Sequence, residues 1–559
     1  MSNLEDNTVN ENAEVTILPK VDLDYILVNE IGQFGKFQVK ILLLAAIIAI
    51  FGAWGATEYA FTTARISTRC VILECDALQP EWSPAWLSNA VPKTSQGSFD
   101  YCQRFGNVSV LQQSADNETC PSILFNRDTL EPCEKYVYEN THSVAYDFEL
   151  ACDEWRRTLI GTIRTFGTFT ALPITGYVSD RFGRRVALTL NAFNTGWIGL
   201  VRYWANSYAG FTISEFAEAT FGSGGFSSVY ILVMELVGPK YRVAAGAALN
   251  TSFALGEVMM GLIAWGIPNW RPLTLALYVP MLLTISYFWI VSESIRWLMS
   301  KGRFDESEKL LRKVAKVNGK SLSEKSMKAL RHNAEETEKN RVLEEQQSGN
   351  EPWLIVQVFR HKRILLRCCI SPVWWMTNTF IYYGLAINAV NMSGNRYLNF
   401  TAVSAAEIPG QWTAVYFMER IGRKPVLIFA FWLCAACQIA YIFLPHDMYT
   451  ASLIVYLTAK YAIAMVMTSV YVYTAELYPT KYRHSLFAFS SMMGRIGSML
   501  APLTPAIGAQ WFEELPFVLF ASLALLSGAL VFLSPETLGT NLPDTFEQAS
   551  QIGRKDYKN

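Results

Sequence analysis

The sequence predicts an all-α polytopic membrane protein with two duplicated halves and twelve transmembrane helices. Apolar residues make up 51% of the 559-residue chain and charged residues only 17%, against about 25% charged residues in a typical soluble domain. The charged residues gather in clusters that adjoin long apolar segments. Several of these clusters recur about 240 residues further along the chain, and duplicated halves are common in transporters.

Two motifs carry the duplication. The first reads GYVSDRFGRR at 176–185 and VYFMERIGRK at 415–424. The second reads ELVGPKYR at 235–242 and ELYPTKYR at 476–483. Each copy adjoins an apolar run, so we expect each to mark the end of a membrane helix in its own half.

Twelve segments reach the length of about 20 mainly apolar residues that a membrane helix needs. The predicted spans are residues 40–62, 156–178, 186–205, 208–234, 243–267, 272–291, 364–388, 398–417, 426–444, 450–474, 485–508 and 515–533. The first 20 residues are acidic and polar, so we expect no cleavable signal peptide and an uncleaved signal anchor in the first span. Basic residues follow spans 2, 4, 8 and 10, which predicts that these connections and both termini are cytoplasmic.

The spans divide the chain into five predicted parts. A cytoplasmic segment, a first bundle, a cytoplasmic linker, a second bundle and a cytoplasmic tail cover residues 1–39, 40–298, 299–363, 364–533 and 534–559. The linker holds fifteen basic and ten acidic residues, and its spacing of Leu and Val predicts short amphipathic helices. The excess of basic residues in the linker indicates a surface exposed to solvent. The more specific alternative is that this surface binds anionic lipid headgroups.

The connection at 63–154 is predicted to form a disulfide-rich extracellular loop. Its six cysteines are Cys70, Cys75, Cys102, Cys120, Cys133 and Cys152. An even number of cysteines outside the cell predicts three disulfides, but six cysteines allow 15 pairings and the sequence selects none of them. Two sequons predict glycosylation at Asn107 and Asn117.

The duplicated motifs also predict a cytoplasmic charge latch that stabilises one state of the protein and opens in another. In the first motif, Gly176 is expected to let a helix end pack closely against a neighbour. A purely topogenic role of the basic residues is the alternative. The predicted latch residues are Gly176, Asp180, Arg181, Gly183, Arg184, Arg185, Glu235, Arg242, Glu419, Arg420, Gly422, Arg423, Glu476 and Arg483.

Four ionisable residues are predicted to form two pairs inside the membrane. Arg164 and Glu215 lie at similar depth in spans 2 and 4, and Glu407 and Lys460 do so in spans 8 and 10. Charges inside a membrane are costly, and they usually pair or mark functional sites. We favour structural or gating ion pairs over direct contact with a substrate.

Other residues are candidates for substrate binding. Arg495 lies near the middle of span 11 without an obvious partner, and Glu257 in span 5 is either its partner or a proton site. Trp375, Thr379 and Tyr382 share one side of span 7. Such an aromatic face suits an organic cation, although helix packing explains the same spacing. Tyr230 is a weaker candidate of the same kind.

The sequence resembles the organic ion transporters of solute carrier family 22, within the major facilitator superfamily. The motifs that carry this resemblance are GYVSDRFGRR, CDEWRR at 152–157, MELVGPKYR at 234–242, ESIRWL at 293–298, YYGLAIN at 382–388, EIPG at 407–410 and YTAELYPTKYR at 473–483. The resemblance covers residues 22–545. It implies two pseudo-symmetric six-helix bundles, alternating access and a plasma-membrane location.

The resemblance also bears on two individual residues. It implies that the position of Arg495 is acidic in cation carriers and Arg in carriers of anions and carnitine-like compounds. The family usually has Arg at the position of Glu215, so no family-wide role is transferred to that residue.

We therefore predict a secondary active or facilitative transporter of amine-bearing cations or zwitterions, carnitine-like or biogenic-amine-like. The alternatives are an organic anion exchanger that uses Arg495, and a non-transporting receptor or scaffold that displays the cysteine-rich loop. The sequence has no nucleotide-binding or hydrolase motif, so we expect neither an enzyme nor a cofactor or metal site. The expected partners are a small organic ion and the lipid bilayer, without nucleic acid; self-association through the loop stays open.

Overall fold

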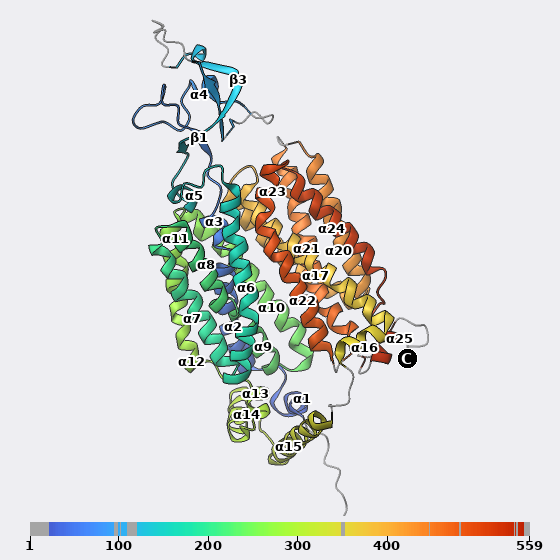
Figure 1. The fold of residues 1–559 in the computed structure, drawn as a ribbon. Helices are drawn as coiled ribbons and strands as arrows, with labels where there is room; N and C mark the ends of the chain where they lie inside the picture. The colour runs from blue at the N-terminus through green and yellow to red at the C-terminus, as the bar shows by residue number, and fades with distance from the viewer. Residues whose placement is uncertain are drawn as a thin grey trace, which may run out of the picture. The chain divides into compact units, whose positions relative to one another are not determined.

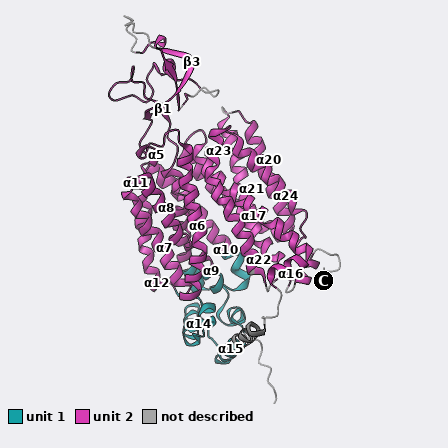
Figure 2. Ribbon diagram, in the orientation of Figure 1, with its two compact units in different colours: residues 1–42, 232–245, 292–351 teal, residues 43–231, 246–291, 352–559 magenta. Residues whose placement is uncertain are grey.

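The computed structural model describes residues 22–93, 99–100, 102–108, 120–347, 353–445, 448–479, 482–540, 543 and 546–552. The chain folds into two compact units (Figure 2). Unit 1 comprises residues 1–42, 232–245 and 292–351, and unit 2 comprises residues 43–231, 246–291 and 352–559. Three helices, α2, α9 and α10, run from one unit into the other.

Unit 2 is built mainly from long helices, coloured from blue to red along the chain in Figure 1. Its first half, residues 43–231 and 246–291, contains α2 (Lys36–Thr57), α3 (Tyr59–Thr62), α6 (Glu154–Phe182), α7 (Arg184–Val201), α8 (Tyr208–Gly222), α9 (Gly225–Leu236), α10 (Arg242–Gly266), α11 (Trp270–Met281) and α12 (Tyr287–Ile290). A short 3₁₀ turn, η3 (Arg202–Trp204), follows α7. Side-chain caps from Asp153, Ser207 and Asn269 begin α6, α8 and α11, since each accepts a backbone N–H of the first turn.

The second half of unit 2 starts at residue 352. It contains α16 (Leu354–Arg360), α17 (Lys362–Asn388), α18 (Arg396–Ala405), α19 (Glu407–Met418), α20 (Arg423–Phe443), α21 (Tyr449–Leu477), α22 (Arg483–Leu500), α23 (Thr504–Gln510), α24 (Leu515–Val531) and α25 (Phe546–Gln551). The core of this half lies between α17, α20, α21 and α24, where Trp374, Phe431 and Phe520 are fully buried. Burial of such large rings supplies much of the packing energy.

Each of the twelve predicted spans coincides with one helix or with consecutive shorter helices. Within the described residues, five segments are both long and apolar enough to cross a membrane: Lys36–Thr62, Pro239–Gly266, Trp270–Ile290, Arg423–Phe443 and Tyr449–Leu477. The helix α24 is apolar but shorter, and the other ranges are broken or more polar. The number of membrane crossings therefore stays a prediction.

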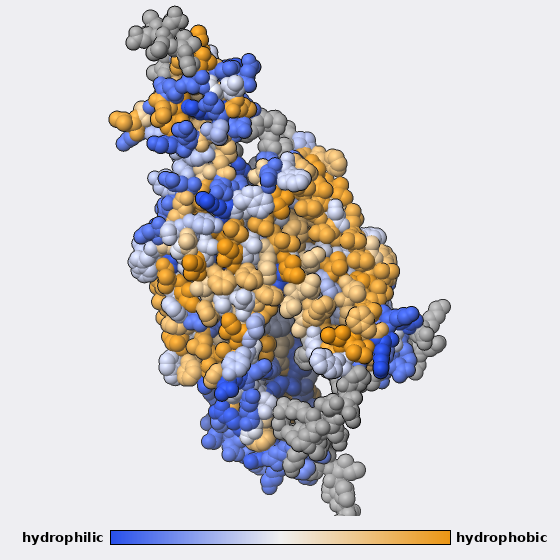
Figure 3. Space-filling view, in the orientation of Figure 1, coloured by the Kyte–Doolittle hydropathy of each residue, from blue (hydrophilic) through white to orange (hydrophobic). Residues whose placement is uncertain are grey.

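Large apolar side chains on the helix surfaces are exposed to the surroundings. Leu43, Ile213, Trp289 and Phe443 are 64%, 66%, 74% and 80% exposed. Figure 3 shows hydrophobic residues over much of the visible helical face of unit 2, whereas the cysteine-rich loop is largely hydrophilic. Exposed apolar surface on this scale is typical of contact with lipid.

The cysteine-rich loop forms a small folded module. Strand β1 (Thr68–Cys70) pairs antiparallel with β4 (Tyr136–Tyr138), and β2 (Gln103–Asn107) pairs antiparallel with β3 (Phe125–Pro132). The short helices α4 (Leu87–Ala90) and α5 (Val144–Asp147) complete it.

The predicted disulfides of this loop are confirmed. The three bonds join Cys70 to Cys133, Cys75 to Cys120, and Cys102 to Cys152. Cys70, Cys120 and Cys133 belong to the small apolar core of the module. A module of this size gains stability from such cross-links because its apolar core is small.

Unit 1 combines the start of the described chain with the predicted linker. It contains α1 (Leu23–Ile26), the short π-helical turn Leu27–Ile31, α13 (Ile295–Ser300), α14 (Phe304–Asn318) and α15 (Glu324–Gln347). Polar contacts tie these segments together: Asp24 Oδ1 lies 2.7 Å from Arg242 Nη2 and 2.5 Å from Arg296 Nη2. Asn318 Oδ1 accepts the Phe37 N–H at 2.9 Å.

Candidate functional site

Arg164 and Glu215 meet in a buried charge cluster in the first half of unit 2. Arg164 Nη1 lies 2.6 Å from Glu215 Oε2 and also contacts Glu218. Arg202 enters from the turn after α7, with its Nη2 at 3.2 Å from Glu215 Oε2 and 3.1 Å from Glu218 Oε2. Arg202 also contacts Glu58 between α2 and α3. All five residues are at most 4% exposed.

Three members of this cluster were missed from the sequence. Glu58 and Arg202 fall near the ends of predicted spans, where a charge looks like an ordinary interfacial residue. Glu218 lies three residues after Glu215 and therefore on the same helix face, which is a signal that the sequence does contain. The completed cluster holds three carboxyl groups and two guanidinium groups.

Glu407 and Lys460 meet in the second half of unit 2. Lys460 Nζ lies 2.7 Å from Glu407 Oε1, and both side chains are fully buried. Tyr382 holds this pair in place: its hydroxyl donates to Glu407, its carbonyl oxygen accepts from Lys460 Nζ at 3.0 Å, and its ring centroid lies 3.7 Å from Nζ. Lys460 thus occupies the ring face that was expected to receive an organic cation.

A glycine permits the close helix approach at each ion pair. A Cβ atom on Gly167 of α6 would lie 2.7 Å from the Phe216 carbonyl oxygen of α8. A Cβ atom on Gly410 of α19 would lie 2.5 Å from the Tyr461 carbonyl oxygen of α21. Each glycine follows its charged residue, Arg164 or Glu407, by three positions and so shares its helix face.

Glu407 and Lys460 lie within electrostatic range of Glu257, whereas the sequence left two alternatives for Glu257, a pair with Arg495 or a proton site. The Glu257 side chain on α10 is 1% exposed, and Glu407 and Ser404 are near enough to interact with its carboxyl group. Lys460 is its nearby cation. The depth of a residue along its own helix could not predict the neighbours of Glu257, because depth does not show which residues of the two halves face each other.

Arg495 on α22 is half-buried, and its guanidinium makes no ion pair or hydrogen bond within the described part of the chain. Two tyrosines, Tyr383 on α17 and Tyr471 on α21, lie within electrostatic range of it. Tyr471 is 40% exposed and Tyr383 is half-buried, so both rings are accessible. Tyr230 on α9 lies within range of Tyr471. Arg495 is therefore a half-buried cation within electrostatic range of two partly accessible tyrosine rings.

The predicted aromatic face of α17 is mostly packed inside the second half. Trp375 is 1% exposed, donates its Nε1–H to Thr474 Oγ1 at 3.1 Å, and packs edge-on against Tyr471 with 4.5 Å between the ring centroids. The Thr379 hydroxyl bonds to the carbonyl oxygens of Trp375 and Gly494. The stripe at this spacing thus faces α21 and α22. Trp375 packs against the partly exposed Tyr471 ring.

The two copies of the first latch motif have the same backbone turn. Gly183 and Gly422 adopt φ values of 107° and 111°, a region that favours glycine. Asp180 Oδ1 pairs with Arg184 Nη1 at 2.8 Å in the first copy. In the second copy, Arg423 Nη2 pairs with Glu476 Oε1 at 3.0 Å. Each of these ion pairs joins residues of one half.

The remaining latch residues have diverse surroundings. Arg181 and Arg420 lie over the rings of Phe182 and Tyr416, Arg185 lies over the ring of Phe288, and Glu419 is exposed. The Glu235 carboxylate accepts the Ser294 hydroxyl, and Arg483 Nε donates to the Tyr478 carbonyl oxygen at 3.4 Å. Gly176 corrects the prediction of close packing, because it is exposed and a Cβ atom there would meet no atom within 4 Å.

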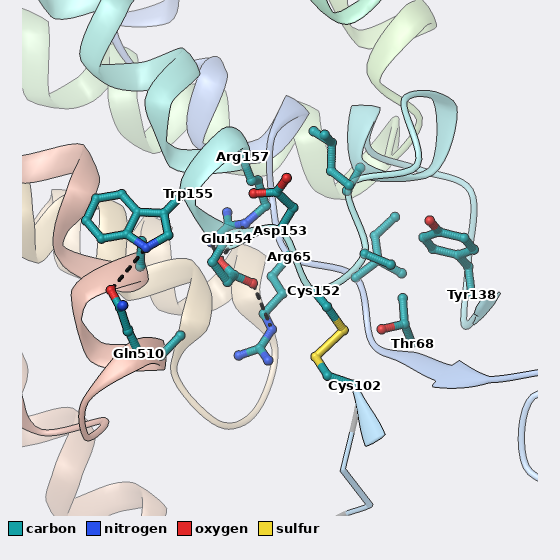
Figure 4. Close-up of a pocket in the computed structure, with 16 residues that line it drawn as sticks. Arg65, Thr68, Cys102, Tyr138, Cys152, Asp153, Glu154, Trp155, Arg157 and Gln510 are labelled. Carbon is teal, nitrogen blue, oxygen red and sulfur yellow. Dashed lines mark hydrogen bonds and ion pairs between the residues drawn. A yellow bond between two sulfur atoms is a disulfide. The ribbon is translucent and has the colours of Figure 1, made fainter. Parts of the chain in front are cut away.

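A cavity of about 300 Å³ lies where the cysteine-rich loop meets α6 and α23 (Figure 4). Glu154 binds two arginines there, Arg65 Nε at 3.2 Å and Arg157 Nη2 at 2.5 Å. The Trp155 Nε1–H donates to Gln510 Oε1 at 3.1 Å and so joins α6 to α23. Burial raises the pKa of Tyr138, so its phenol in this cavity stays neutral.

The two predicted glycosylation sites differ in what the structure describes. Asn107 lies at the exposed end of β2, and its Nδ2 donates to Glu74 Oε1 at 2.6 Å. Asn117 lies outside the described residues. Glycosylation of either residue stays a prediction.

Comparisons with known proteins place the chain in a family. Residues 115–548 match the family described as "Sugar (and other) transporter". The Drosophila melanogaster organic cation transporter protein is 29% identical over 95% of both chains. Solute carrier family 22 member 3 of Rattus norvegicus is 29% identical over 93% of this chain and 94% of its own.

A solved structure shares the fold. The inward-open xylose transporter XylE of E. coli aligns over 92% of this chain and 99% of its own, with a TM-score of 0.61 and 14% identity. At this identity the similarity shows the fold alone. The chain belongs to the sugar (and other) transporter family of the major facilitator superfamily, and it is a multi-pass membrane transporter rather than an enzyme.

Proposed function

We propose that this transporter moves small organic ions that carry an amine, as cations or zwitterions, by alternating access. The observation that carries the proposal is the half-buried Arg495 guanidinium, which has no ion-pair partner in the described structure and lies within electrostatic range of Tyr383 and Tyr471. A guanidinium in this position can bind a carboxylate. The rings can hold an ammonium group, in a contact worth about 0.5–2 kcal/mol.

The arrangement around Tyr383 favours a substrate with both charges. Tyr383 lies within electrostatic range of Arg495 and also of Glu257. A zwitterion can therefore direct its carboxylate to Arg495 and its ammonium towards Glu257, across one tyrosine ring. The names of the curated relatives, which include organic cation transporters, support the amine-bearing part of this proposal.

Contacts between the two halves of unit 2 support a gate that is closed at the end of the protein that carries the cysteine-rich loop. At the end that carries the cysteine-rich loop, Trp155 of α6 bonds to Gln510 of α23, and Arg396 Nη1 donates to the Arg65 carbonyl oxygen at 3.1 Å. We infer that these contacts open in another state, and that the latch residues Asp180 and Arg423 then form contacts across the halves at the opposite end. We place the disulfide-rich loop outside a plasma membrane and both termini in the cytoplasm, which suits the oxidised cysteines.

Uptake by purified protein in liposomes tests this proposal. The radiolabelled probes are a quaternary ammonium cation, an aliphatic carboxylate and a trimethylammonium carboxylate zwitterion, with protein-free liposomes as the control. We expect saturable uptake of the zwitterion and the cation. Uptake of the carboxylate alone would instead support an anion exchanger that uses Arg495, and absence of uptake for all three would contradict the proposal.

A further inference from the structure

The short helix α16 exposes a strip of large apolar side chains. Trp353, Ile355, Val356 and Phe359 are 81%, 63%, 45% and 64% exposed. At 3.6 residues per turn these four positions share one side of the helix, and Arg360 lies at the edge of this side. A helix on the surface of a water-soluble protein shows the reverse pattern, with its polar face turned outwards.

The opposite side of α16 is fixed to the second half of unit 2. Gln357 Nε2 donates to the Tyr482 hydroxyl at 3.1 Å, and the His361 ring stacks on Phe546 of α25 with 5.3 Å between the ring centroids. Val358 is buried in the apolar cluster that contains Phe546. Figure 1 accordingly shows α16 beside α25. Because these contacts hold the inner side, the apolar strip is kept on the outside.

Basic residues adjoin this strip. Residues 353–369 include four Lys or Arg and no Asp or Glu. Arg363 and Arg367 donate to backbone carbonyl oxygens of the protein. The side chains of Arg360 and Lys362 are exposed and make no ion pair or hydrogen bond with the described residues. Two positive charges beside the strip therefore lack a carboxylate partner within the described chain.

The exposed apolar surface continues along α17. Lys362, Leu366 and Cys369 follow each other at i, i+4 and i+7, and all three are exposed. The helix α17 covers a predicted membrane span, so Lys362 lies at the end of a helix face that is suited to lipid. Tryptophan and basic residues at such a level are typical of the membrane interface, where the ring lies among the headgroups and the cation reaches the phosphates.

We propose that α16 lies in the interface of the cytoplasmic leaflet, and that Arg360 and Lys362 bind the headgroup of an anionic phospholipid. Trp353, Ile355 and Phe359 enter the boundary between headgroups and acyl chains, as the apolar face of an interfacial helix does. The headgroup oxygens accept hydrogen bonds from the guanidinium and the ammonium. Two cations without carboxylate partners favour an anionic lipid over a zwitterionic one.

This site is narrower than a linker that binds lipid along its whole length. The apolar residues Leu311 and Val314 of α14 are buried, and its exposed basic residues Lys309 and Lys316 follow the acidic residues of its first turn. The helix α14 thus has the pattern of a solvated surface helix. The lipid site is independent of the substrate that the transporter carries.

Native mass spectrometry of the full chain, with phosphatidylserine or phosphatidylcholine added, tests the headgroup site. We expect the wild type to retain phosphatidylserine preferentially. Arg360→Gln/Lys362→Gln should reduce this preference about 25-fold, or about fivefold for each charge removed. Lys309→Gln/Lys316→Gln in α14 removes the same charge and should keep the preference. Equal losses in both double variants, or a wild type that retains both lipids equally, would overturn the proposal.

Fluorescence quenching in liposomes tests the position of α16. The lipids carry bromine either beside the headgroup or near the end of the acyl chain, and the difference between wild type and Trp353→Phe isolates the Trp353 signal. We expect stronger quenching by bromine beside the headgroup. Trp432→Phe is the control, because Trp432 is partly exposed in the middle of α20 and should respond more to the deep bromine. A Trp353 signal that neither lipid quenches would overturn the proposal.

The same measurements identify a protein partner on this face. If the strip bound a second copy of the chain, the wild type would appear as a dimer that Ile355→Ser/Phe359→Ser dissociates, and Trp353 would be shielded from both brominated lipids. That result would overturn the lipid site. A wild-type monomer that retains phosphatidylserine, with Trp353 quenched beside the headgroups, is the result that supports it.

Discussion

At the scale of single residues, charge pairing distinguishes Arg495 from the other intramembrane candidates. Arg164, Arg202 and Lys460 each contact a carboxylate while almost completely buried. Arg495 is half-buried and has no carboxylate partner in the described structure. A buried charge with partners stabilises a helix arrangement, whereas an accessible charge without partners can bind a ligand.

Arg202→Ala should destabilise the protein strongly. Arg202 contacts Glu58, Glu215 and Glu218, so its loss leaves the cluster with three carboxyl groups and one guanidinium. Breaking such a buried group typically costs about 3–5 kcal/mol. Thermal unfolding in detergent should show a large fall in midpoint for Arg202→Ala and none for Arg312→Ala, whose ion pairs are exposed. Equal midpoints for wild type and Arg202→Ala would refute the role of the cluster.

The Glu407–Lys460 contact should appear as energetic coupling. Lys460→Met leaves Glu407 without its cation, and we expect it to lose about 3–5 kcal/mol of stability. Glu407→Gln should lose less, because Glu257 remains within electrostatic range of Lys460. The double variant should recover part of the loss seen in Lys460→Met, because Glu407 then no longer carries an unpaired charge. A double-mutant cycle on unfolding midpoints measures the coupling, and additive effects would show that the two residues act independently.

At the scale of elements, close helix approaches at two glycines position the ion pairs. Gly167 brings α6 against α8, and Gly410 brings α19 against α21. The two glycines lie about 240 residues apart, which is the spacing of the repeated motifs. The charges beside them are reversed, since α6 and α8 carry Arg164 and Glu215 whereas α19 and α21 carry Glu407 and Lys460.

Gly410→Ala should separate α19 from α21 and weaken the Glu407–Lys460 pair. The new Cβ atom would lie 2.5 Å from a backbone oxygen, so a helix has to shift. Overpacking of this kind usually costs about 1–3 kcal/mol. Gly176→Ala is the control, because its Cβ atom would meet open space. Unfolding midpoints and uptake should fall for Gly410→Ala alone, and an equal response of both variants would contradict the packing argument.

At the scale of the whole molecule, the sequence predicts the family and the charged pairs better than the detailed site. The pairs were predictable because a charge inside an apolar segment needs a partner at similar depth, as Arg164 and Glu215 show. Disulfide pairing was not predictable, because all 15 combinations of the six cysteines were compatible with the sequence. The surroundings of Glu257 and Trp375 were not predictable either. The spacing of residues in a helix shows which of them share a face, but it does not show which other helix packs against that face.

The cytoplasmic latch is predicted to influence the conformation of the whole transporter. The Asp180 side chain is 76% exposed, so its pair with Arg184 adds less than about 1 kcal/mol to stability. Asp180→Asn should therefore leave the unfolding midpoint unchanged. The latch hypothesis predicts in addition that the variant favours the inward-open state and turns over more slowly, because Asp180 would lose a contact across the halves that forms in another state. Labelling of engineered cysteines near this end, with an impermeant reagent, measures the shift. Unchanged labelling and turnover together with reduced expression would favour the topogenic alternative.

The central claim, that Arg495 contacts the substrate of a transporter, is tested most directly by reversing its charge. Uptake into proteoliposomes is compared for wild type and Arg495→Asp, using the cation, carboxylate and zwitterion probes after the amount of folded protein has been matched. Like charges in a low-dielectric site repel strongly. We predict that Arg495→Asp loses saturable zwitterion uptake and retains or gains uptake of the cation. A variant with the wild-type affinity for every charged probe would contradict the account.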